Sequence, residues 1–128
     1  MDVEELRGLL SASRGIEKVM GDVLRALYLF SGALWLPELV LELEGLNATL
    51  GDTAPSSDEV EDAVKRLARK GYVTLRPGIR ATMSAEGQRT VLVSIVRDSD
   101  LLKEVSMDPR VIRYRRIWEE VFREEGAT

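Results

Sequence analysis

The segment from Ser56 to Gly71 carries both a helix start and a helix stop, and it constrains the fold more than any other stretch of the chain. Ser56 and Glu59 form an S-x-x-E pattern, in which the hydroxyl and the carboxylate satisfy free amides at the start of a helix. Gly71 follows two basic residues, which is a common end for a helix. Because the apolar residues in between recur at helical spacing, the segment predicts an amphipathic helix over 57–70.

A small β-hairpin is predicted directly after this helix. Residues 72–75 and 79–83 alternate apolar and polar side chains, and the dipeptide Pro77-Gly78 between them is typical of a turn. Arg76 and Arg80 would then flank the tip of the hairpin. We expect the tip to be rigid, exposed and positively charged.

Helices are also predicted on both sides of this unit. Apolar residues recur at steps of three and four over 16–30, and again after Pro37 over 39–46, so two helices joined by a short link precede the loop at 47–57. Ser84 is placed to cap a further helix that runs to about residue 97. The apolar run at 91–96 could equally form a strand, and its polar flanks favour the helix.

The two ends of the chain each carry an apolar stripe. One lies in the first ten residues, and the other lies on a last helix that is predicted to start at Asp108-Pro109. Each stripe could pack on its own domain. Alternatively, the two stripes could pair two copies of the chain in a homodimer. The residues assigned to such a dimer interface are Leu6, Leu10, Val111, Tyr114, Trp118 and Val121.

Helix, short link, helix, loop, well-capped helix and basic hairpin form the order of a winged helix-turn-helix. The expected fold class is therefore mainly α with a small β-hairpin wing. Residues 1–128 are expected to form one domain, with a core at about 16–97 and flanking helices in 1–15 and 98–128 that serve dimerisation.

Residues 63–73 (AVKRLARKGYV) and 83–87 (MSAEG) resemble the MarR and PadR families of winged-helix transcription regulators. In those families a recognition helix of the form ALkrLekeGlV is followed by a wing, and then by T-x-x-G, where this chain has serine in place of threonine. The resemblance covers about 16–96 in outline. It implies DNA binding, with the third helix in the major groove, and dimerisation through helices outside the core.

The predicted third helix begins with four acidic residues, which would repel phosphates. The acids could stabilise the helix start and pair with Lys65 and Arg66 four residues later. One carboxylate could instead accept a hydrogen bond from cytosine. The helix could also face a protein partner and have no need of a basic front. The residues assigned to DNA contact are Lys65, Arg66, Arg69, Lys70, Arg76 and Arg80.

The expected function is that of a DNA-binding transcriptional regulator, a homodimer whose helix 57–70 and wing 76–80 face double-stranded DNA. The net charge of −4 means that such contact would have to come from a local basic patch. The alternative is a winged-helix module that binds proteins and not DNA. No polar constellation marks a site for a small-molecule effector.

The chain contains no cysteine and no histidine, which removes thiolate nucleophiles, imidazole bases and zinc sites built on these ligands. We therefore expect neither an enzyme nor a bound metal or cofactor. No window approaches the roughly eighteen unbroken apolar residues of a membrane span, and the acidic N-terminus lacks a secretory signal, so a cytoplasmic location is expected. Fourteen of the eighteen basic residues are arginine, and Asn47 and Gln88 are the only side-chain amides, which together suggest a heat-adapted source. Genomic base composition could also account for part of this bias.

Overall fold

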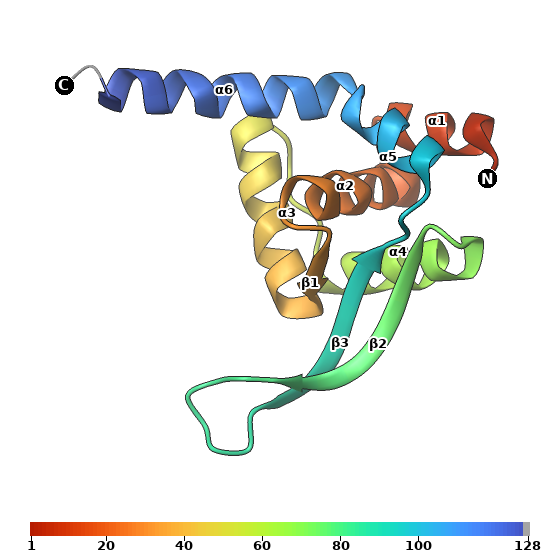
Figure 1. Ribbon diagram of the computed structural model, residues 1–128, viewed down its shortest axis with the longest axis vertical. Helices are drawn as coiled ribbons and strands as arrows, with labels where there is room; N and C mark the ends of the chain where they lie inside the picture. Colours follow the sequence, from red (N-terminus) through yellow and green to blue (C-terminus); the bar gives the residue numbers. More distant parts are fainter. Residues whose placement is uncertain (127–128) are drawn as a thin grey trace.

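The structure is a computed structural model that describes residues 1–126, and it is mainly helical with one small antiparallel sheet (Figure 1). This confirms the predicted balance of helix and strand. In the described part of the chain the elements are α1 (Val3–Ser11), α2 (Gly15–Leu29), β1 (Ala33–Trp35), α3 (Leu36–Leu50), α4 (Ser57–Lys70), β2 (Val73–Arg80), β3 (Gln88–Ile95), α5 (Ser99–Ser106) and α6 (Pro109–Gly126).

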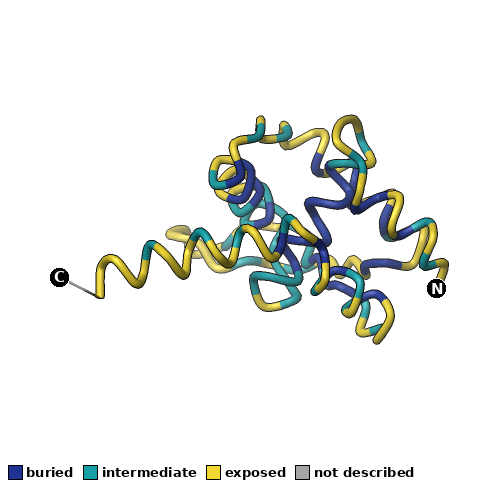
Figure 2. The backbone as a smooth tube through the Cα atoms, turned by 90° about the horizontal axis from the view of Figure 1, so that it is seen from above, coloured by how far each residue is buried: buried dark blue, intermediate teal, exposed yellow. Residues whose placement is uncertain are grey.

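Helix α2 forms the centre of the molecule. Residues 19–27 are all buried, so this helix is covered on every side and not only along the one stripe that the sequence predicts. Helices α1, α3, α4 and α5 pack around it, and their buried side chains are mostly leucine and valine. Figure 2 shows the buried residues gathered in the middle of the molecule, whereas the helix that leads to the C-terminus is mostly exposed.

The sheet has the strand order β1-β3-β2, with both pairs antiparallel. Ala33 in β1 pairs with Ser94 in β3, and Arg80 at the end of β2 pairs with Gln88 at the start of β3. Because β1 is only three residues long, it covers the inner end of β3 alone. The outer halves of β2 and β3 extend from the body as a two-stranded hairpin (Figure 1).

The helix predicted over 84–97 is wrong, because residues 88–95 form strand β3. The aliphatic run 91–96 follows its strand propensity, since β1 and β2 lie hydrogen-bonded on its two sides. The predicted link at 33–36 supplies one of these strands, β1, which the sequence prediction did not assign to the sheet. The polar residues that favoured a helix start belong instead to the connection at 81–87.

The predicted turn at Pro77-Gly78 is also wrong, because both residues lie inside β2. Proline is tolerated in an edge strand, where its missing N–H costs no ladder hydrogen bond. Gly78 leaves room for the indole of Trp35, because a Cβ added there would lie 2.9 Å from Cη2 of that ring. The strand therefore continues through both residues, and the tip of the hairpin lies at 81–87.

A buried arginine joins three segments that are far apart in the sequence. Arg25 on α2 is fully buried, and its guanidinium donates to Asp22 on the same helix at 2.8 Å and to Asp108 before α6 at 2.7 Å. It also donates to the backbone carbonyl of Leu10 at the end of α1. Since Asp108 in turn accepts from the backbone amides at the start of α6, one side chain fixes α1, α2 and α6 together.

The charges continue from this arginine towards the surface. Lys18, one turn before Asp22 on α2, lies 2.7 Å from Asp22 and 3.7 Å from Asp52 in the loop between α3 and α4. Asp52 also pairs with Arg110 on α6. The six residues of this charge chain, which alternate in sign, are Asp108, Arg25, Asp22, Lys18, Asp52 and Arg110.

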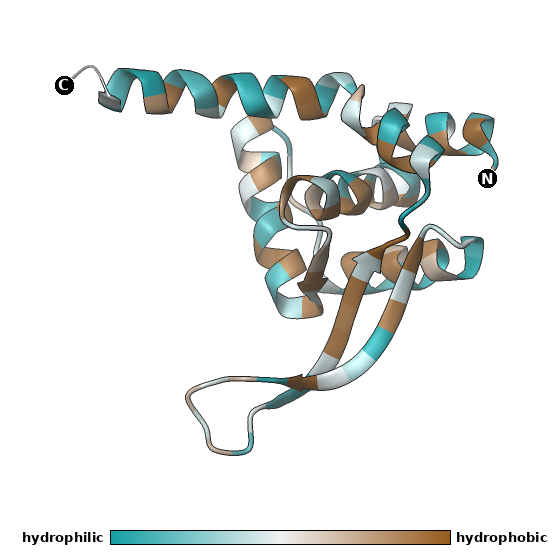
Figure 3. Ribbon diagram, in the orientation of Figure 1, coloured by the Kyte–Doolittle hydropathy of each residue, from teal (hydrophilic) through white to brown (hydrophobic). Residues whose placement is uncertain are grey.

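Helix α6 starts at Asp108-Pro109 as predicted, and only its first half lies on the body (Figure 1). Val111 is fully buried, and the ring of Tyr114 meets Phe30 edge to face at 5.9 Å. Beyond this contact the aromatic row continues through Trp118 to Phe122, which are 38% and 65% exposed. Figure 3 shows these apolar bands alternating with hydrophilic ones along the free part of the helix.

Candidate nucleic-acid interface

The start of α4 is fixed by the predicted capping box. The Ser56 hydroxyl accepts from the Glu59 amide at 3.2 Å, and the Glu59 carboxylate accepts from the Ser56 amide at 3.0 Å. Gly71 ends the helix in the left-handed conformation with φ of 85°. The buried side of α4 holds Val60, Ala63, Val64 and Leu67 against α2, so the charged side faces outward.

Replacing Ser56 with alanine is expected to lower the free energy of unfolding by about 1 kcal/mol, because the amide of Glu59 loses its partner. Urea denaturation would measure this. Ser57→Ala, one residue into the helix, is the control and should be close to neutral.

The capping box also predicts a pH dependence. The amide and hydroxyl of Ser56 donate to the Glu59 carboxylate and so lower its pKa below the ordinary value. A carboxyl whose pKa is lower in the folded state adds stability above its unfolded pKa and loses it as pH falls through the folded pKa. The stability difference between the natural chain and Glu59→Gln should therefore be largest near neutral pH and shrink in acid. A difference that grows in acid would contradict this.

The acids at the front of α4 pair within the helix. Glu61 lies 3.2 Å from the Lys65 ammonium, and Asp62 lies 3.1 Å from the Arg66 guanidinium. This confirms the predicted pairing at i+4. Two of the assigned DNA contacts therefore already have a carboxylate partner on their own helix.

The end of α4 offers one base with a free charge. The ammonium of Lys70 lies 2.9 Å from the carboxylate of Glu5 on α1, in a contact whose geometry is that of an ion pair and not of a hydrogen bond. Arg69 donates to the backbone carbonyl of Lys65 at 3.3 Å and has no carboxylate partner among residues 1–126. Lys70 thus ties α4 to α1, whereas the exposed guanidinium of Arg69 keeps its charge.

The two assigned arginines of the hairpin lie on one face of β2 and not at its tip. Arg80 lies 3.4 Å from Glu38 at the start of α3 and donates to Gln88 across the hairpin at 3.1 Å. Arg76 is exposed, and its side chain has no ion pair or hydrogen bond within the described part of the chain. Of these two assigned arginines, Arg76 is therefore the one that can more readily reach an outside anion.

The tip of the hairpin, residues 81–87, carries no base. Its only charged residue is Glu86, and Met83 is fully exposed. Arg89, opposite Ile79 in the β2–β3 register, is a further exposed base that sequence analysis missed. It was missed because residues 84–97 were assigned to a helix, and the alternation of strand residues would have shown its position.

The residues assigned to a dimer interface fall into two groups. Leu6, Leu10 and Val111 belong to the core of this chain, where α1 packs on α2 and α5 and where α6 meets the body. Trp118 and Val121 lie on the free half of α6, and Tyr114 lies between the two groups, against Phe30. Only the second half of the predicted seam is open to a partner.

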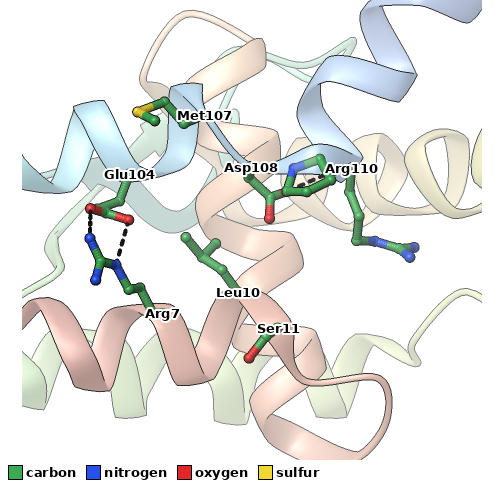
Figure 4. Close-up of a pocket in the computed structure, with 8 residues that line it drawn as sticks. Arg7, Leu10, Ser11, Glu104, Met107, Asp108 and Arg110 are labelled. Atoms are coloured by element: carbon green, nitrogen blue, oxygen red, sulfur yellow. Dashed lines mark hydrogen bonds and ion pairs between the residues drawn. The ribbon is translucent and has the colours of Figure 1, made fainter.

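An open cavity of about 570 Å³ lies between the end of α1 and the turn that joins α5 to α6 (Figure 4). One wall is the ion pair of Arg7 with Glu104, at 2.9 Å, and this pair lowers the pKa of the Glu104 carboxyl. Leu10, Met107 and Pro109 form the apolar part of the lining. In Figure 4 the guanidinium of Arg110 points away from this cavity, so its polar groups do not converge on one point.

Comparisons with protein-family models, with curated proteins and with solved structures gave no match. Within residues 1–126, no three or more acidic side chains gather in a group that could hold a metal ion. None of the helices in this part of the chain has the length and apolarity that crossing a membrane requires.

Proposed function

We propose that the chain is a DNA-binding protein whose core, from α2 to β3, is a winged helix-turn-helix. The observation that carries the proposal is the arrangement of α2, β1, α3 and α4 followed directly by a projecting β-hairpin. This order is that of winged helix-turn-helix proteins, which place the third helix of the core in the major groove. The resemblance of residues 63–73 to MarR and PadR regulators supports the same role in transcription.

The bases that carry the contact are Arg69 on α4 and Arg76 on β2. Both are exposed, and both lack a carboxylate partner among the described residues. Lys65, Arg66, Lys70 and Arg80 contribute less, since binding a phosphate would first break an existing ion pair. Such contacts to the phosphate backbone position a protein on DNA without reading its sequence.

The test is binding to a mixed-sequence DNA duplex, measured by fluorescence anisotropy across a salt series. Affinity should fall as salt rises, and Arg69→Ala/Arg76→Ala should weaken binding and reduce the salt slope by about one for each phosphate that is no longer neutralised. Arg113→Ala/Arg123→Ala on α6 makes the same change in net charge and is the control. Affinity that is independent of salt, or an equal loss in both variants, would refute the proposal.

A second candidate function is protein binding without DNA. It is favoured by a specific observation, the carboxylate partners of four of the six assigned bases. A stoichiometric protein partner, together with no measurable affinity for duplex DNA at low salt, would select this candidate over the first.

The homodimer is proposed through the free half of α6, where Trp118 and Phe122 expose aromatic surface. Replacing Phe122 with glutamate puts a charge into this apolar surface and is expected to convert a dimer to a monomer in light scattering at micromolar concentration. Met83→Glu, at the fully exposed hairpin tip, is the matched control. A monomeric natural chain, or a dimer that Phe122→Glu leaves intact, would contradict this assignment.

A further inference from the structure

The loop between α3 and α4 is held by charge and not by burial. Residues 51–56 contain no fully buried side chain, and only Asp52 and Pro55 are half-buried. The side chain of Asp52 meets Lys18 from α2 and Arg110 from α6, and its amide donates to the Asn47 carbonyl at 2.8 Å. The ion pairs of Asp52 are thus the main anchor of the segment that leads into α4.

Helix α6 is held to the body by contacts concentrated near its start. They include the bond from Arg25 to Asp108, the burial of Val111, the ring contact of Tyr114 and the ion pair of Arg110, and the next residues to reach the body are Arg115, over the ring of Tyr28, and the partly buried Ile117. Arg110 is the residue of α6 that reaches the loop at 51–56. A shift of α6 would therefore pull its guanidinium away from Asp52.

The geometry points to a conformational link between two parts of the molecule. When α6 is docked on the body, the charge chain keeps the α3–α4 loop and the first turn of α4 ordered, and when α6 moves away, both become less ordered. The link depends on the carboxylate of Asp52, which pairs with both Lys18 on α2 and Arg110 on α6. When α6 moves, Asp52 loses Arg110 and keeps only its 3.7 Å contact with Lys18. Lys18 also pairs with Asp22 at the shorter distance of 2.7 Å, so Asp52 is then held less firmly. Because Ser56 directly follows this loop, the capping box of α4 loses part of its positioning.

Amide hydrogen exchange followed by NMR tests the link in the full chain. The reporter amides are those of Asp52, Glu59 and Val60, which bond to Asn47 and Ser56. The reference amides are those of Gly71 and Tyr72 at the other end of α4. Arg110→Gln should speed exchange at the reporters about threefold to fivefold, the range expected for one partly exposed ion pair. Arg113→Gln, on the exposed side of the same helix, is the control and should leave them unchanged.

Release of α6 by a different change provides the second arm. Tyr114→Ala removes the ring contact with Phe30 and should also speed the reporter amides. In the Arg110→Gln background, Tyr114→Ala should not speed exchange at the reporter amides any further, because the ion pair between Arg110 and Asp52 is already absent. Equal acceleration at the reference amides, additive effects of the two changes, or no effect of Arg110→Gln would each overturn the proposal.

The consequence for DNA rests on the proposed function, in which α4 faces the duplex. Under that function, whatever displaces α6 also weakens DNA binding. The exchange experiment contains no DNA, so its failure would remove the link and leave the proposed function untouched. Failure of the salt-series experiment would remove the proposed DNA-binding function and leave the link between α6 and the α3–α4 loop untouched.

Discussion

Replacing Arg25 with methionine is expected to lower the free energy of unfolding by about 3–5 kcal/mol, the cost of removing one partner from a buried ion pair. The side chains of Asp22 and Asp108 are only 1% and 4% exposed, so both carboxylates would lose their guanidinium where water cannot replace it. Leu10 would also lose the donor to its carbonyl. Most domains have a total stability of about 5–15 kcal/mol, so this one change should remove a large part of it.

Urea denaturation followed by tryptophan fluorescence measures the effect. The control is Arg115→Met, since the exposed Arg115 lies over the ring of Tyr28 at 5.2 Å and such a contact contributes about 0.5–1 kcal/mol. A loss for Arg25→Met no larger than that of the control would show that the buried charges do not depend on the guanidinium. The variant Arg25→Met/Asp108→Asn should recover part of the loss, because Asp108 has no other cation partner among the described residues, whereas Asp22 keeps Lys18. Asparagine at position 108 can still accept from the amides at the start of α6.

Replacing Gly21 with alanine is expected to cost about 1–3 kcal/mol, the usual penalty for overfilling a packed core. The added Cβ would lie 2.6 Å from the carbonyl oxygen of Leu9 and 3.0 Å from Nη1 of Arg25. The first of these atoms is backbone, so α1 would have to move away from α2. The free energy of unfolding from urea denaturation is again the measurement.

Gly45 provides the matched control for this substitution. It also lies within a helix, but a Cβ added there would meet no atom within 4 Å. Gly45→Ala should therefore raise stability by about 0.5–1 kcal/mol through helix propensity alone. If Gly21→Ala were stabilising as well, the Leu9 carbonyl would not lie close enough to Gly21 to clash with an added methyl group.

Helix α4 could be predicted in full from the sequence, because its determinants are local. The capping box at Ser56, the stop at Gly71 and the apolar spacing all lie within sixteen consecutive residues, and each has the predicted role. The pairs of Lys65 and Arg66 with acids four residues earlier are equally local. A helix whose determinants need no distant partner can therefore be predicted from a short stretch of sequence.

The sheet could not be predicted in the same way, because strand pairing depends on residues far away in the sequence. Residues 91–95 become part of a strand because Ala33 to Trp35 pair on one side and Val73 to Pro77 on the other. Neither partner is visible in a local window. The misplaced tip follows from the same cause, since Pro77-Gly78 forms a turn only if the second strand starts at Ile79.

The charge chain was missed for a different reason. Lys18, Asp22 and Arg25 lie three and four residues apart on a helix whose apolar spacing predicts one buried stripe, and such a stripe leaves the charges facing water. In fact α2 is covered on all sides, and the charges find partners from Asp52 and Asp108. Charged residues at i, i+4 and i+7 in an otherwise apolar helix were the available signal.

Strand β2 has one outer edge with no strand beside it, since β3 lies between it and β1. A free strand edge normally acts as a template on which a strand of another molecule can add, and such additions lead to aggregates. Pro77 stands in the middle of β2 and carries no N–H, which interrupts the row of donors along that edge. Pro77 therefore keeps the outer edge of β2 from offering an unbroken row of donors, even where the hairpin extends far from the body.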